Sequence, residues 1–183
     1  MLALLTLSAL TAPVALATDI TLSEGTMGLK VDVDNDHGTE LQMPGDIRFM
    51  FDDRIVVDEE MNDLFAFASK VRFEAPVHDN AFVFAEAITV DDVPLGGDLY
   101  GFASSIDLNG DVNGDVYAFM GDLYIGPNAV IHGNLTAFGG TVDLEGTVLG
   151  DAKITTGDFA FSGHIVGDLD LEVGDVEFTD GAR

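Results

Sequence analysis

One short phrase is written three times between Gly97 and Leu149. The copies run from Gly97 to Asn113, from Gly114 to His132 and from Gly133 to Leu149, with lengths of 17, 19 and 17 residues. In each copy a Gly is followed at fixed offsets by an Asp or Asn, an aliphatic residue and a Phe. A unit this short cannot bury its own apolar side chains, so neighbouring copies must stack to form a core. The repeat therefore predicts a solenoid.

Less regular copies extend the repeat in both directions. They begin at Gly45, Asn62, Asp79, Gly150 and Gly167, which gives eight turns of about 17 residues. Each turn contains three short pieces of alternating apolar and polar residues, separated by Gly, Asp, Asn or Pro and too short for a helix. Three strands per turn, each paired with its equivalent in the next turn, predict an all-β chain. The expected fold is a parallel β-helix of triangular section, roughly 35 to 40 Å long.

Equivalent positions of the turns form columns. The columns that start at Val71 and Phe73 are apolar in every copy and are predicted to face inward. A third column is phenylalanine where the preceding residue is small, as at Gly101 and Ala118, and turns polar where that residue is large, as at Ile154. This exchange of volume favours an inward phenylalanine ladder in one corner of the core, formed by Phe67, Phe84, Phe102, Phe119 and Phe138. Strict alternation would instead place the ladder outside, as an exposed aromatic stripe and lateral binding face.

A neighbouring column changes from aromatic to charged along the chain. Its members are Phe65, Phe82, Tyr100, Tyr117, Thr136, Lys153 and Asp170. Such a column must lie mostly outside the core. It is either a protein-binding patch or a surface over which the segment 18–44 folds.

The N-terminal sequence predicts export. Residues 1–17 read as a signal peptide, because an apolar run ends in Ala15-Leu16-Ala17 before polar Thr18 and is too short for an ordinary membrane span. No basic residue precedes Lys30, so an uncleaved anchor or a start further upstream are the alternatives. Residues 18–44 are predicted to cap the first coil, and residues 45–183 to form the repeat domain.

Charge and composition exclude several classes of partner. The chain has 33 acidic and seven basic residues, a net charge of −26, and no cysteine. Nucleic acid is excluded because binding to phosphates needs clustered Lys and Arg. Anionic membrane surfaces are disfavoured for the same reason. Without cysteine there are no disulfides or thiolate sites.

Few residues have a pattern that could carry chemistry. The best candidates for calcium ligands are four acids of one turn, Asp32, Asp34, Asp36 and Glu40, although Gly38 is one place late for an EF-hand. A solvated acidic turn is the alternative. The four histidines are scattered, and none accompanies a Ser or Cys nucleophile motif. We therefore predict no enzyme, no catalytic residue and no cofactor.

The stretch GDVYAFMGDLYI from Gly114 to Ile125, with the spaced glycines from Gly140 to Gly150, resembles the bactofilin family of polymer-forming cytoskeletal proteins. The resemblance covers about residues 45–183. It implies a right-handed β-helix that polymerises end to end, without nucleotide, into bacterial filaments or scaffolds. The signal peptide and the acidity suggest an exported relative, periplasmic or at the cell surface. A membrane-associated cytoplasmic protein is the alternative.

The last turn is predicted to be an assembly surface. It keeps the apolar columns at Leu169, Leu171, Val176 and Phe178, and no amphipathic segment follows to cover them. A terminal coil also leaves backbone groups unpaired, which favours addition of a coil from a second molecule. We therefore expect a non-enzymatic structural protein that binds itself, with an envelope or cell-wall component as a further partner. The alternative is an exported β-helix binding module for a glycan, a surface partner or calcium.

Overall fold

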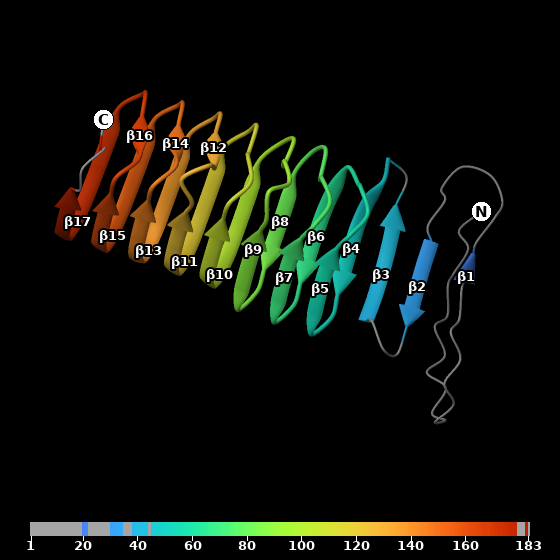
Figure 1. The fold of residues 1–183 in the computed structure, drawn as a ribbon. Helices are drawn as coiled ribbons and strands as arrows, with labels where there is room; N and C mark the ends of the chain where they lie inside the picture. The colour runs from blue at the N-terminus through green and yellow to red at the C-terminus, as the bar shows by residue number, and fades with distance from the viewer. Residues whose placement is uncertain (1–19, 22–29, 35–37, 44, 179–181, 183) are drawn as a thin grey trace, which may run out of the picture.

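The chain winds into a row of stacked turns built only of strands. The computed structural model describes residues 20–21, 30–34, 38–43, 45–178 and 182, and the turns follow one another from β4 to β17 (Figure 1). Equivalent residues of neighbouring turns pair in parallel, as Leu99 does with Val116 and Val116 with Leu135. The predicted all-β solenoid of about eight turns is confirmed.

Each turn contributes to three faces. The first face contains β4 (Ile47–Phe51), β6 (Asp63–Phe67), β8 (Ala81–Phe84) and the first halves of five ten-residue strands. The second face contains β5 (Arg54–Val57), β7 (Lys70–Phe73), β9 (Ala87–Val90) and the second halves of those strands. The ten-residue strands are β10 (Leu99–Leu108), β11 (Val116–Ile125), β13 (Leu135–Leu144), β15 (Ala152–Phe161) and β17 (Leu169–Phe178). The third face contains β12 (Val130–Ile131), β14 (Thr147–Val148) and β16 (His164–Ile165), preceded by single bridges from Met61 to Ile131.

Alternating side chains from all three faces fill the interior. In the columns that start at Val71 and Phe73, every residue as far as Phe159 and Phe161 is buried, which confirms that these columns face inward. The third face adds buried side chains at Met61, Val77, Leu95, Val112, Ile131 and Val148. The apolar core therefore runs along the axis of the solenoid, and each turn buries its apolar side chains against its neighbours.

The corners require glycine. A Cβ on Gly146 would lie 2.5 Å from the carbonyl oxygen of Ala129 and 2.6 Å from that of Gly126, both of the turn below. A Cβ on Gly110 would meet the backbone oxygens of Val93 and Asp91 at still closer approach. Backbone atoms cannot move away as the end of a flexible side chain can, so the recurring glycines allow close stacking at the corners.

Antiparallel strands precede the solenoid. β1 (Ile20–Thr21) pairs with β2 (Lys30–Asp34), β2 with β3 (Gly38–Met43), and β3 with β4. β3 therefore occupies the edge of β4 that faces away from β6. β5 pairs only with β7 among the described strands, so β3 covers the edge of the first face and leaves that of the second face unpaired by any described strand. Residues 1–17, predicted to be a signal peptide, lie outside the described residues.

The prediction of an inward phenylalanine ladder is wrong. Phe67, Phe84, Phe102, Phe119 and Phe138 all lie outside, with 36 to 59% of each residue exposed. Strand alternation decides this, because the preceding residues, Ala66 to Ala137, are buried and successive side chains point to opposite faces. The inward column is small for a different reason. A Cβ on Gly101 would already lie 2.8 Å from Cδ1 of Ile106 on the second face.

Candidate functional site

The last turn exposes the cross-section of the core. Phe159 and Phe161 are 1% and 5% exposed, whereas the residues that follow them in the same columns, Val176 and Phe178, are 46% and 58% exposed. Phe178 packs edge-on against Phe161, with ring centroids 6.1 Å apart. Leu169 is exposed as well, and Leu171 is half-buried. The structure thus places the four residues predicted as the assembly surface on one strand. We call residues 167–178, which contain all four, the C-terminal coil.

The backbone of the C-terminal coil also ends in a free edge. β17 is the last strand of the large sheet and pairs with β15 and with no other described strand. One side of β17 therefore carries N–H and C=O groups without a neighbouring strand. A row of such groups is a template for a strand of another chain.

Acidic side chains surround this end. Asp168, Asp170, Glu172, Asp175 and Glu177 are all exposed. The only basic group that an ion pair brings to them within the described chain is Lys153, whose Nζ lies 3.6 Å from Oδ2 of Asp170. Two such ends repel each other over a range that dissolved salt shortens.

The N-terminal end of the core is closed in a different way. The inward column of Leu64, Leu99 and Leu135 begins at Arg48, which pairs with Leu64 in the β4–β6 register. The Arg48 guanidinium lies 3.5 Å from Glu40 and 3.6 Å from Glu59. A hydrogen-bonded charge at this position makes the N-terminal end polar, whereas Leu169 leaves the C-terminal end of the same column apolar.

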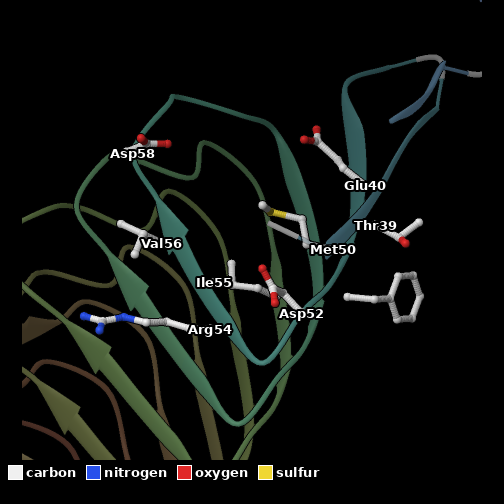
Figure 2. Close-up of a pocket in the computed structure, with 10 residues that line it drawn as sticks. Thr39, Glu40, Met50, Asp52, Arg54, Ile55, Val56 and Asp58 are labelled. Atoms are coloured by element: carbon white, nitrogen blue, oxygen red, sulfur yellow. The ribbon is translucent and has the colours of Figure 1, made fainter. Parts of the chain in front are cut away.

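A cavity of about 340 Å³ lies between the first coil and β3 (Figure 2). Figure 2 shows Met50 and Ile55 between Glu40 on β3 and Asp58 on the first coil. The lining of the cavity contains three acids, Glu40, Asp52 and Asp58, and one basic side chain, Arg54, beside apolar residues such as Ile55. This mixed lining shows no arrangement of a nucleophile and a base.

Three of the four calcium candidates lie in described strands. Asp32 lies opposite Glu40 in the β2–β3 register, Asp34 lies opposite Gly38, and Asp36 falls outside the described residues. The Glu40 carboxylate is already paired with Arg48. Within the described part of the chain, no group of three or more His, Cys, Asp or Glu side chains could hold a metal ion.

A ladder of Asp and Asn side chains runs along one corner, and we call it the polar ladder. Its members are Asp63, Asn80, Asp98, Asp115, Asn134, Asp151 and Asp168. Each Oδ1 accepts a hydrogen bond of 2.7 to 3.1 Å from the backbone N–H of the next member. For Asp168, in the last described turn, no described residue supplies the corresponding N–H donor.

Two tyrosines join the polar ladder. The hydroxyl of Tyr117 donates to Oδ2 of Asp115 at 3.1 Å, and that of Tyr100 to Oδ2 of Asp98 at 3.2 Å. The bond to Asp115 is the main cause that raises the pKa of Tyr117, and burial followed by the bond to Asp98 raises the pKa of Tyr100. Both hydroxyls therefore remain neutral donors at physiological pH.

Two ladders of stacked rings cover the outside of the first face, and together we call them the aromatic face. The inner ladder is formed by Phe49, Phe65, Phe82, Tyr100 and Tyr117. The outer ladder is formed by Phe51, Phe67, Phe84, Phe102, Phe119 and Phe138. From Phe49 to Tyr117 and from Phe51 to Phe119, neighbouring centroids are 4.4 to 5.1 Å apart and the planes differ by at most 9°. The described strands of the segment 18–44 extend the sheet beyond β4 and pair edge to edge.

The sequence predicts that the column from Phe65 to Tyr117 lies outside, and the structure agrees. The polar ladder is not among the predictions. The recurring Gly-Asp and Gly-Asn pairs are the sequence signal of the polar ladder, but they also fit simple turns. The Arg48 cluster had no comparable signal, because one charged residue in an irregular copy does not reveal which way it points. Among the described residues, no helix has the length and apolar character to cross a membrane.

The fold and the described C-terminal end define a class of protein. The chain is a β-solenoid whose C-terminal coil exposes apolar side chains and one edge of β17. The sequence profile of the bactofilin family, described as polymer-forming cytoskeletal, matches residues 87–183. Because the match covers more than half of the chain, the protein belongs to the bactofilin family. Neither a curated protein nor a solved structure matched the chain.

Proposed function

We propose that this protein is a structural component of the bacterial envelope that assembles end to end through its C-terminal coil. The observation that carries the proposal is the exposure of Val176 and Phe178, whose columns are buried in every other clear turn. Family membership supports polymer formation as the role. The role is structural and not enzymatic.

The contacts that favour end-to-end assembly differ in kind from the charges that oppose it. Covering the exposed half of each apolar side chain contributes about 1 kcal/mol, and the free edge of β17 adds backbone hydrogen bonds. The acids from Asp168 to Glu177 oppose association. Because salt screens exposed charges and leaves apolar contacts in place, assembly should increase with ionic strength.

Light scattering of the purified protein across NaCl concentrations, with negative-stain imaging, tests the proposal. Scattering should rise with salt, and Val176→Lys should abolish the rise because it places a charge in the cross-section. Glu177→Lys is the matched control, since its side chain points outward on the same strand. This variant should assemble at lower salt than the wild type. A protein that stays monomeric at every salt concentration would contradict end-to-end assembly and favour an exported binding module.

Location in the envelope is supported by the apolar run of residues 1–17 and its Ala-Leu-Ala end. The protein recovered from cells should begin at Thr18 and fractionate with the envelope. An intact Met1 in the cytoplasmic fraction would contradict export while leaving assembly open to the test above.

A further inference from the structure

The aromatic face is large enough to be an interface. The six phenylalanines of the outer ladder are 36 to 59% exposed. With about 200 Å² for a whole aromatic side chain, they present roughly 500 Å² of apolar surface. The half-buried inner ladder and the borders add to this area. A stable protein interface buries about 800 Å² on each partner, and the whole aromatic face approaches that value. A contiguous apolar patch of this size is near the upper end of what a soluble monomer exposes, and such patches often mark interaction sites.

The orientation of the rings narrows the choice of partner. Each ring from Phe67 to Phe102 is stacked on both sides, so its two faces are covered by its neighbours and its edge points outward. A sugar or a cation binds to the open face of an aromatic ring. Ring edges instead fit another apolar protein surface.

The charges along the two borders of the aromatic face further restrict the choice of partner. On one side the polar ladder follows the face, with acids at Asp63, Asp98 and Asp115. These acids repel an anionic lipid surface. On the opposite side the outward residues that stack from turn to turn are mostly small and neutral, as at Ser104 and Gly121, with Asp53 and Glu86 as acidic exceptions.

We propose that the aromatic face binds the aromatic face of a second copy, so that two solenoids pair side by side. A face repeated along a straight solenoid can match its own copy about a two-fold axis. If the two solenoids point in the same direction, the border of each that carries the polar ladder lies over the less acidic border of the other. If they point in opposite directions, the two acidic borders meet. Charge therefore selects the pair with the same direction. The pairing uses no residue of the C-terminal coil.

Sedimentation velocity in the Val176→Lys background tests the pairing separately from end-to-end assembly. This variant should sediment as a dimer of the 19.4 kDa chain. Adding Phe102→Lys and Phe119→Lys should weaken the dimer by about a hundredfold or more, because central aromatic residues dominate such interfaces. Polar residues occur naturally in this outward column at Thr155 and Glu172, so these variants should fold, which circular dichroism checks.

Thr89→Lys with Ala160→Lys is the matched control, since both replace neutral outward residues on the second face by the same charges. This control should leave the dimer intact. A monomeric Val176→Lys protein would overturn the proposal, and binding of that monomer to neutral phosphatidylcholine vesicles would assign the face to lipid instead. A dimer that survives the two Phe→Lys changes would overturn it as well.

Fluorescence energy transfer between two dyes tests whether the paired solenoids point in the same direction. The chain has no cysteine, so Asp58→Cys and Glu177→Cys place single labels in the first and last turns, roughly 35 Å apart along the axis. Transfer between two Asp58→Cys chains, or between two Glu177→Cys chains, should exceed transfer in the mixed pair. Stronger transfer in the mixed pair would refute the same-direction arrangement.

Discussion

At the scale of single residues, Asp143 is an acid whose environment opposes its charge. It lies in the outward column of the second face between Tyr124 and Ala160, and its side chain is half-buried. Burial, and after it the negative charge of Glu145, raise the pKa of Asp143 above its usual value. Glu145 is itself held in place as the acceptor of the Tyr124 hydroxyl at 3.0 Å.

This raised pKa predicts how an Asp143→Asn variant responds to pH. The folded protein binds the proton more tightly than the unfolded chain, so the contribution of Asp143 to stability falls as pH rises from about 3.8 through the raised pKa. The variant removes this penalty. It should be more stable than the wild type at pH 7, and the difference should shrink below pH 4, as measured by urea unfolding. Asp107→Asn, an exposed acid of the same column, should change little. An equal gain from both variants would assign the effect to net charge.

At the scale of elements, the polar ladder joins turns that strand pairing alone would leave loose at the corner. Asp115 is its best-connected member. Its Oδ1 accepts from the backbone N–H of Asn134 at 2.7 Å and from Nδ2 of Asn134 at 3.1 Å, and its Oδ2 accepts from Tyr117. Because each link satisfies a donor of the next turn, the ladder contributes to the stacking of turns and not only to its own corner.

Asp115→Ala should therefore destabilise the fold by about 1 to 3 kcal/mol, since it leaves the donors of Asn134 and Tyr117 without their acceptor. Asp115→Asn is the control, because Asn80 and Asn134 already serve as acceptors at equivalent positions. It should retain most of the stability. Urea unfolding midpoints measure both. If Ala and Asn cause the same loss, the hydrogen bonds of Oδ1 are not what stabilises the corner.

The sequence predicted these elements where one period dominates. Seventeen residues per turn and alternation within each piece determine the faces, their register and the inward columns. The phenylalanine ladder was misplaced because its volume exchange with Gly101 and Ala118 was weighted above the alternation that governs every strand. The restriction at Gly101 comes from Ile106 across the core, a contact between faces that no single-strand pattern reveals. The four residues of the assembly prediction follow from the same columns, and the structure shows Leu169, Val176 and Phe178 exposed. Their part in assembly stays a prediction.

At the scale of the whole molecule, the two ends of the solenoid differ while its middle is uniform. β3 and Arg48 close part of the N-terminal end with a paired edge and a polar cluster. In the described part of the C-terminal coil, the apolar columns are exposed and β17 pairs on one side only. In the middle, each turn contacts its two neighbours, so stability should be close to a sum of turns and of interfaces between turns. The length of the solenoid is then free to vary, provided that it changes by whole turns.

Deletion of one complete turn tests this independence. Removing residues 133–149 joins His132 to Gly150, and β11 can then pair with β15 in the register that β13 had with each of them. The shortened protein should fold, unfold cooperatively at a lower temperature because one interface between turns is lost, and still assemble with salt through its unchanged C-terminal coil.

Removing residues 133–140 is the control. This deletion is shorter, but it removes only the first-face part of the turn. The second-face half of β13 would then follow the third face directly, and its columns could not align with the turns on either side. This smaller deletion should unfold the protein, as circular dichroism and thermal unfolding can show. If the eight-residue deletion were tolerated better than the 17-residue one, stability would not reside in whole turns, and the one-dimensional description of the solenoid would be wrong.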